Sequence, residues 1–363
     1  MSSAAAIASP GATVVSSLEQ TPAEFAIRDP LRVLMVTSDY PTKGRPRTTH
    51  FIKRQAEFLR TAGVDVEVFH FEGYRKFGNY VRAWVRLQRH LKRARYDLVH
   101  AQFGQSGILA FPKRMPLVVT LRGSDILGTL DDASGRYTVK GRVLQALSRQ
   151  ISRRADAVIL VSDHMREAAG RADSVHVIPS GLDLALFRPI PRDEARHRLG
   201  LSPHKRLVLF VGRPNQARKR FALAKQAVEI LDRTLPAELV VAWSVQHVDI
   251  PYYMAACDVM VFTSMQEGSP NVVKEALACN LPVVSVPVGD VEARLTGIEG
   301  CELCRDERPE AIAAALERVL RRGARVNARA TVAHLDETLL TQKVIAIYES
   351  VLGRRELSAP IRV

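Results

Sequence analysis

Short apolar runs alternate with longer amphipathic stretches along most of the first half of the chain. A helical spacing of apolar residues runs from about Thr49 to Ala62, and a second helix is expected near 138–153. The apolar runs between these stretches are the expected strands: Leu31–Thr37, Val64–Phe69, Leu98–Ala101, Leu117–Leu121 and Ala157–Val161. Strands of this kind, alternating with helices, are typical of a parallel sheet that is covered by helices on both faces.

The pattern changes in a Pro- and Gly-rich connection that begins at Val177–Asp183 and continues to about Pro203. A second series of strands and helices follows it. The strands expected there are Arg206–Val211, Leu239–Trp243, Val259–Phe262 and Pro282–Val286, and the helices are 216–233, Pro309–Arg321 and about 336–353. Two Rossmann-like halves joined by a linker account for this order. Ligands of such sheets bind at the carboxyl ends of the strands, here in a cleft between the halves.

Length and composition also indicate two folded domains. A chain of 363 residues exceeds a typical single core, and 47% hydrophobic with 25% charged residues is the composition of a folded protein. We expect a first domain at 29–190, a second at 191–340, and a C-terminal helix and tail at 341–363. Residues 1–28 lack the basic start and apolar run of a secretory signal and are expected to be a disordered leader. No run approaches the roughly 20 apolar residues that span a bilayer, so a cytoplasmic location is expected.

One segment of the second half has the composition of a strand end, a polar loop and a helix start. Ser269 is suited to the N-cap and Pro270 to the first helical position. The amides of Asn271, Val272 and Val273 would then be free at the positive end of the helix dipole. Such a helix end binds phosphate without a charged side chain.

Two glutamates flank this predicted helix start. Glu275 would lie five residues into the helix, about 7–8 Å along its axis, which is about the offset between a diphosphate and a ribose. Glu267 precedes the helix and would face a sugar. The alternative is that Glu267 ends a turn and Glu275 is a solvated helix residue, which would be favoured for two isolated glutamates.

A second candidate phosphate site follows the strand that ends before Gly212. Arg213 and Lys219 straddle the turn into the next helix. A departing diphosphate leaves negative charge that a guanidinium and an ammonium can neutralise. Alone, the two would more often be surface charges, but beside an anion-binding helix they indicate a phosphate clamp.

These residues together resemble a known family. Glu267 and Glu275 match the E-x7-E motif of retaining GT-B glycosyltransferases, particularly family four, and Gly212, Arg213 and Lys219 match the G-R-x5-K diphosphate clamp of that family. Val177–Pro189 looks like its interdomain linker. The resemblance implies two Rossmann-like domains facing each other across a cleft, with a C-terminal helix that crosses back to the first domain.

The same resemblance implies a chemistry. Transfer would be independent of a metal or cofactor, would use a nucleotide sugar as co-substrate, and would retain the anomeric configuration. Arg213, Lys219 and Glu267 would form the catalytic set, with the two cations on the leaving diphosphate and Glu267 on the sugar. Glu275 would bind the ribose. The remaining donor-binding residues would be Gly268, Ser269, Pro270, Asn271, Val272 and Val273.

The sequence departs from the family pattern at three places. Arg122 stands where members often have a donor-contacting histidine, so a charged contact to phosphate or acceptor is expected there. The glycine-rich loop of the first domain is reduced to Gly44, a further candidate for donor binding. The stretch Leu239–Pro251 is short and lacks a strand–helix–strand portion that often helps to bind the nucleotide base, so the sequence does not identify the base. Acceptor-side candidates at predicted strand ends or loops are His50, His100 and Gln102.

The net charge of +14 is concentrated in the first half, where residues 1–190 hold 28 Lys and Arg against 17 Asp and Glu. Within it, residues 74–95 hold eight Lys or Arg and no carboxylate, with Val81, Trp84, Val85 and Leu91 broadly on one side of a predicted helix. This pattern indicates a helix on an anionic membrane surface, or equally a helix whose apolar stripe packs on its own domain. Nucleic acid is disfavoured, because the aromatic residues do not form stacking platforms.

Cysteine usage adds no metal site to this interpretation. Cys301 and Cys304 form a C-x-x-C, but the two further ligands of a structural zinc site are not evident nearby. The function expected first is transfer of a sugar to a lipid-linked or polysaccharide acceptor by a peripheral protein at the cytosolic membrane face. The alternatives are a nucleotide-sugar epimerase on the same fold and a catalytically silent GT-B binding subunit.

Overall fold

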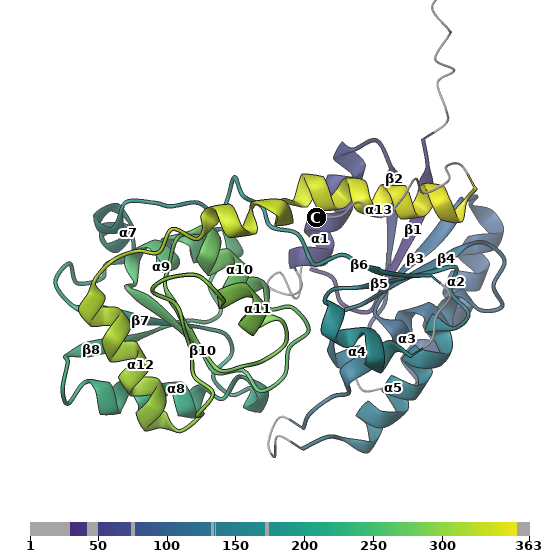
Figure 1. Cartoon of the computed structure of the whole chain (residues 1–363). Helices are drawn as coiled ribbons and strands as arrows, with labels where there is room; N and C mark the ends of the chain where they lie inside the picture. Colours follow the sequence, from purple (N-terminus) through teal and green to yellow (C-terminus); the bar gives the residue numbers. More distant parts are fainter. Residues whose placement is uncertain are drawn as a thin grey trace, which may run out of the picture. The chain divides into compact units, whose positions relative to one another are not determined.

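The structure is a computed structural model that describes residues 30–41, 50–73, 77–131, 134, 136–170 and 174–353. The described residues from Leu31 onward form one compact unit, which holds two parallel sheets with helices around them (Figure 1). The expected leader at 1–28 and Gly44 lie outside the described residues.

The first sheet has six parallel strands in the order β2-β1-β3-β4-β5-β6. Its strands are β1 (Arg32–Thr37), β2 (Asp65–His70), β3 (Leu98–Gln102), β4 (Leu117–Leu121), β5 (Ala157–Leu160) and β6 (Val175–Val177). Its helices are α1 (His50–Thr61), α2 (Phe77–Arg93), α3 (Gly104–Gly107), α4 (Ser124–Leu127), α5 (Val139–Ser152) and α6 (Arg166–Ala169), with 3-10 turns η1 (Ile108–Ala110) and η2 (Asp163–Met165). The five strands expected from the sequence are confirmed. The edge strand β6 was not predicted, because its three residues are only half-buried and lack an apolar run.

The second sheet has five parallel strands in the order β11-β10-β9-β7-β8. Its strands are β7 (Arg206–Val211), β8 (Ala237–Ala242), β9 (Val259–Phe262), β10 (Val283–Ser285) and β11 (Glu302–Leu303). Its helices are α7 (Arg192–Leu199), α8 (Phe221–Leu231), α9 (Ile250–Ala256), α10 (Asn271–Ala278), α11 (Val291–Leu295) and α12 (Pro309–Arg322), with turns η3 (Ala217–Lys219), η4 (His247–Asp249) and η5 (Arg329–Leu335). The last helix, α13 (Glu337–Val351), follows η5 and contacts α1 beside the first sheet.

The helix expected at 216–233 is interrupted near its start. The 3-10 turn η3 comes first, and α8 begins only after Arg220, whose φ of 48° lies in the left-handed region. The guanidinium of Arg220 donates to the carbonyl of Thr263 at 2.6 Å, a contact that ties the turn to the end of β9. A long-range contact of this kind overrides a local helical spacing.

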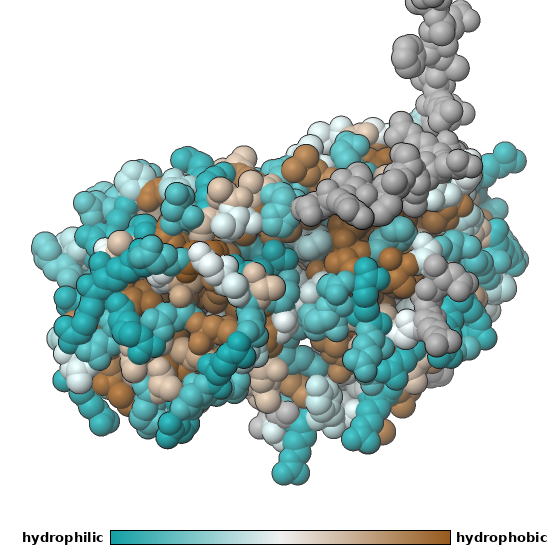
Figure 2. Space-filling model, viewed as in Figure 1, coloured by the Kyte–Doolittle hydropathy of each residue, from teal (hydrophilic) through white to brown (hydrophobic). Residues whose placement is uncertain are grey.

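Both faces of the first sheet are buried, as its apolar strands predict. In β1, Val33 and Met35 belong to one core cluster, whereas Leu34 and Val36 belong to another on the opposite face. In the view of Figure 2, hydrophilic residues cover most of the surface and hydrophobic residues show in smaller areas between them. Among the described residues, none of the helices combines the length and apolar character that crossing a membrane requires.

Helix α13 crosses back to the first sheet (Figure 1), as the resemblance implied. Its Tyr348 hydroxyl lies 2.6 Å from Nδ1 of His100 on β3, and Nε of Arg54 on α1 donates to Glu337 at 2.8 Å. The fold is therefore α/β with two parallel sheets, and the last helix packs on the first of them. The domain boundaries at 190 and 340 stay predictions.

Candidate active site

The helix start that was expected to bind phosphate lies at the carboxyl end of β9, but it begins one residue later than predicted. Pro270 has an extended backbone, with ψ of 113°, and α10 starts at Asn271. Ser269 does not cap the helix, because its hydroxyl donates to Oδ2 of Asp290 at 2.8 Å. The prediction of Ser269 as N-cap and Pro270 as first helical residue is therefore wrong. A charged carboxylate competed successfully for the hydroxyl.

Two of the three expected free amides remain at this helix end. The amide of Val273 donates to the carbonyl of Pro270 at 3.2 Å, so it is not available. The amides of Asn271 and Val272 have no acceptor within the described residues. The side-chain oxygen of Asn271 is also buried without a partner there. The start of α10 thus keeps unsatisfied polar groups at the positive end of its dipole.

Glu267 lies in a cluster with two cations from η3. Its Oε1 is 2.7 Å from Nζ of Lys219 and 2.7 Å from a guanidinium nitrogen of Arg218. Burial raises the pKa of Glu267, but these two positive charges outweigh burial and hold the pKa below its usual range. Burial lowers the pKa of Lys219, and Arg218 adds to that effect while Glu267 opposes it. Arg218 was not predicted, although it directly precedes Lys219 in the sequence.

The Lys219 side chain passes close to Gly212. The backbone of Gly212 has φ of 146°, and a Cβ there would lie 3.6 Å from Cδ of Lys219. The ammonium of Lys219 lies 5.3 Å from the ring centre of Phe262, at the end of β9. Arg213 points elsewhere: its guanidinium lies over the ring of Trp243, 4.8 Å from the ring centre. The two predicted clamp cations therefore lie against different neighbours, Arg213 against Trp243 and Lys219 against Glu267.

Glu275 is buried in the second turn of α10, with 6% of its surface exposed. Nε2 of His247 lies 3.3 Å from Oε1 of Glu275. Burial raises the pKa of Glu275, but the contact with His247 and the nearby positive charges outweigh burial and hold the pKa below its usual range. The ring of His247 stacks on His50 of α1 at 4.9 Å between ring centres. The prediction had His50 on the acceptor side, whereas the structure places it next to the partner of Glu275. His247 was not predicted, since a lone histidine after a strand carries no distinguishing signal.

Three glycines let the loop around Gly268 approach its neighbours closely. A Cβ on Gly268 would lie 2.7 Å from the carbonyl oxygen of Arg122. Gly123, with φ of 130°, and Gly289, with φ of 59°, lie against the same loop: a Cβ on Gly123 would be 3.1 Å from the Gly268 nitrogen, and one on Gly289 would be 2.9 Å from the Gly268 oxygen. Backbone contacts this short exclude side chains, so the position of Glu267 depends on glycine at its neighbour.

Arg122 is held by protein groups. Its guanidinium donates to Oε1 of Gln102 at 3.0 and 2.6 Å, to Oε1 of Gln55 at 3.0 Å and to the hydroxyl of Ser180 at 2.8 Å. Burial lowers the pKa of Arg122 to about 10. Four of its five N–H donors are thus committed, which leaves one for a phosphate or acceptor.

The burial of His100 and Gln102 goes against their prediction as acceptor contacts. Neither has exposed surface. His100 bridges Tyr348 and Thr120 at 2.6 and 2.7 Å, and burial lowers its pKa to about 3. Gln102 positions Arg122. The prediction assumed that residues at the carboxyl end of a strand are accessible, and helix α13 covers this one.

The two parallel sheets with a crossing C-terminal helix define the GT-B class, and comparison with known proteins supports this assignment. Residues 25–181 match the family model described as "Glycosyl transferase 4-like domain", and residues 243–322 match "Glycosyl transferases group 1". The chain thus contains two glycosyltransferase domains and is a glycosyltransferase of the GT-B type.

Individual proteins show the same likeness. A Bacillus subtilis protein named as the teichuronic acid biosynthesis glycosyltransferase TuaC is 27% identical, over 79% of this chain and 89% of its own length. Sucrose-phosphate synthase from Thermosynechococcus elongatus shares the fold with a TM-score of 0.73 and 19% identity, over 90% of this chain and all of that one. Anabaena HepE, solved in complex with UDP and glucose, has a TM-score of 0.67 and 18% identity, over 88% of this chain and all of its own.

Proposed function

We propose that this protein transfers a sugar from a nucleotide-sugar donor, with retention of the anomeric configuration and without a metal. The observation that carries the proposal is the cluster of Lys219, Arg218 and Glu267 beside the free amides of α10. This cluster lies where the carboxyl ends of β7 and β9 meet, the usual ligand site of such sheets. Glu275, in the second turn of α10, supplies a buried carboxylate for the ribose.

Charge balance supports a diphosphate at this site. Arg218 and Lys219 carry two positive charges against the single carboxylate of Glu267, which leaves a surplus of one, and the start of α10 adds the partial positive charge of its dipole. A diphosphate carries about two negative charges, and charge-assisted bonds to it are stronger than neutral ones. The ammonium of Lys219 has three donors, so it can hold Glu267 and a phosphate oxygen together. Stabilisation of the departing diphosphate is the main term by which this site would accelerate transfer.

The histidine pair at Glu275 bears on how the donor would enter. His247 contacts the carboxylate that is proposed to bind the ribose, and His50 stacks on His247 from the first domain. A ribose that bonds to Glu275 therefore shares or replaces the contact of His247. HepE, a protein of this fold, was solved with bound UDP, which supports a nucleoside diphosphate as the ligand class of this site.

We further propose a lipid-linked or polysaccharide acceptor at an anionic, cytosolic membrane surface. On α2, Ala83 and Leu87 are buried, so part of the apolar stripe packs on its own domain, while Val81 and Trp84 stay 47% and 40% exposed. The indole N–H of Trp84 donates to the carbonyl of Phe111 at 2.6 Å, which fixes the ring at the surface. Basic residues flank this patch, as surface binding to anionic lipid requires. The relative TuaC is named for teichuronic acid biosynthesis.

A transfer assay with a panel of nucleotide sugars tests the proposal. Lys219→Ala is expected to lower kcat by about a hundredfold or more, because it removes a charge from the transition state. Glu275→Ala is expected to weaken donor binding. Lys225→Ala, an exposed residue of α8, is the matched control and is expected to leave activity unchanged. Full activity of Lys219→Ala and Glu275→Ala would contradict the site assignment, and donor conversion without any acceptor would indicate an epimerase.

A further inference from the structure

A second cluster of cations lies at the amino ends of the strands of the second sheet, opposite the carboxyl ends that form the proposed donor site. A cavity of about 670 Å³ opens at the amino ends of β7 and β9, and Arg192, Arg196, Arg206 and Arg325 are among the residues that line it. We name it the basal cavity. Strand β7 has six residues, so the cavity lies roughly 20 Å from the proposed donor site at 3.3 Å per residue. Its volume is that of a small-molecule site.

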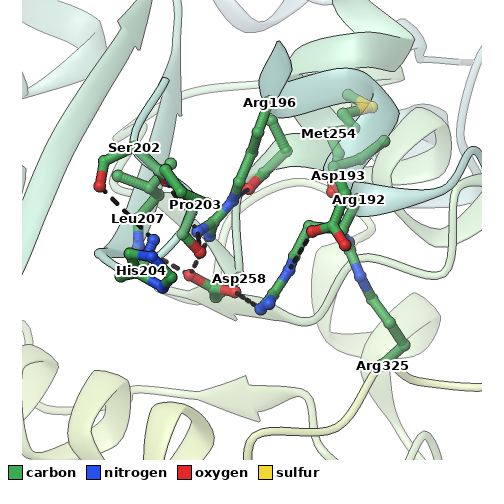
Figure 3. Close-up of polar contacts among 12 residues, drawn as sticks. Arg192, Asp193, Arg196, Ser202, Pro203, His204, Leu207, Met254, Asp258 and Arg325 are labelled. Atoms are coloured by element: carbon green, nitrogen blue, oxygen red, sulfur yellow. Dashed lines mark hydrogen bonds and ion pairs between the residues drawn. The ribbon is translucent and has the colours of Figure 1, made fainter. Parts of the chain in front are cut away.

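Several hydrogen bonds join the residues of one wall of the basal cavity (Figure 3). Arg196 is 1% exposed and donates to the carbonyls of Ala256, Ser202 and Pro203 and to Oδ2 of Asp258, at distances from 2.7 to 3.0 Å. Asp258 also accepts the amide of Leu207 at 2.7 Å. Arg196 and Asp258 therefore stabilise the loop that forms one side of the cavity.

The remaining arginines have donors to spare. Arg325 donates to the carbonyls of Met254 and Ala255 at the end of α9, which uses two of its five N–H groups. Arg206, the first residue of β7, is exposed, and its side chain has no partner in the part of the chain that the structure describes. Arg192 reaches Oδ1 of Asp258 at a long 3.4 Å. Three guanidinium groups thus present free N–H donors to one cavity.

The charges of the basal cavity do not cancel. Four arginines share two carboxylates, those of Asp258 and Asp193, which leaves a surplus of two positive charges. The other two cations of the wall, Lys205 and Arg321, have partners outside it in Glu238 and Glu317. Clustered arginines with open donors match the bidentate geometry of phosphate oxygens.

We propose that the basal cavity binds a phosphate-bearing oligoanion, of the size of a pyrophosphate group, at a site separate from the donor site. The ligand would bond to Arg206 and Arg325, with Arg192 closing the third side. Burial lowers the pKa of Arg325, an effect that a bound anion would offset. The same chemistry fits the pyrophosphate group of a soluble nucleotide and the headgroup of an anionic lipid.

Calorimetric titration of the full chain with inorganic pyrophosphate tests this site. Arg213→Ala with Lys219→Ala serves as the background, because it weakens binding at the donor site. In that background we expect pyrophosphate to bind, and Arg206→Gln and Arg325→Gln each to raise its Kd about tenfold or more, the effect of one lost charge-assisted bond. Lys225→Gln changes the net charge equally on α8 and is expected to leave Kd unchanged.

Arg206→Gln keeps the test decisive if Arg325→Gln unfolds. The Arg206 side chain makes no hydrogen bond or ion pair with a described residue, so its replacement should not change thermal melting. Unchanged pyrophosphate affinity in Arg206→Gln, or an equal loss in Lys225→Gln, would overturn the proposal. Sedimentation with phosphatidylcholine vesicles, with and without phosphatidylglycerol, separates the sources. Vesicle binding that depends on Arg206 assigns the site to a lipid headgroup, and vesicle binding indifferent to Arg206 assigns it to a soluble ligand.

Discussion

Gly268→Ala tests how closely the site depends on backbone packing. The new Cβ would lie 2.7 Å from the carbonyl oxygen of Arg122 and 3.2 Å from a methyl carbon of Val161. Ordinary contact begins near 3.4 Å, so the loop that carries Glu267 has to move by about 0.7 Å. Gly268 has no left-handed backbone, so an alanine is strained only by lack of space. The perturbation is therefore a displacement of Glu267 and not a general loss of folding.

A displacement of this size is large for a catalytic site. Misplacement of about 1 Å is able to cost about a hundredfold in rate, so we expect kcat/KM to fall between about tenfold and a hundredfold, with a small change in melting temperature. Gly78→Ala is the matched control: a Cβ there meets nothing within 4 Å, and alanine favours the helix α2. Steady-state kinetics and thermal melting of both variants are compared with the unchanged protein. Full kcat/KM in Gly268→Ala would refute the reasoning.

Two further predictions concern stability. Arg54→Ala leaves the buried carboxylate of Glu337 without its partner and should lower the free energy of unfolding, measured by urea titration, by about 3–5 kcal/mol. The double variant Arg54→Met with Glu337→Leu should recover most of the lost free energy. Equal stability of Arg54→Ala and the unchanged protein would contradict this prediction. His100 has its pKa lowered from 6.5 to about 3, so its contribution to stability is fully present above pH 6.5 and is lost as pH falls toward 3. In His100→Asn, the slope of unfolding free energy against pH in that window should decrease by about one proton, and an unchanged slope would show that His100 is accessible.

Much of the fold could be predicted from the sequence, because both sheets are built from apolar strands that alternate with helices. The strands that were missed, β6 and β11, have three and two half-buried residues, too few to show a pattern. The interruption at Arg220 could not be predicted, since it depends on a contact with Thr263, 43 residues away in the chain.

The donor side of the candidate site was predictable in its residues but not in its contacts. Glu267, Glu275 and Lys219 lie at the ends of β7 and β9, in the region where motif and strand order placed them. The link from Glu275 through His247 to His50 joins residues from both halves, so no local pattern reveals it. His100 was misjudged for the same reason, because the helix that covers it begins more than 200 residues later.

We propose above that the start of α10 and the cations of η3 form a diphosphate site. Calorimetric titration with UDP, GDP and ADP tests it most directly, because it requires neither the acceptor nor the sugar to be known. We expect that at least one of these nucleotides binds and that Lys219→Ala raises its Kd about tenfold or more. Binding of none of them, or equal binding by Lys219→Ala, would contradict it.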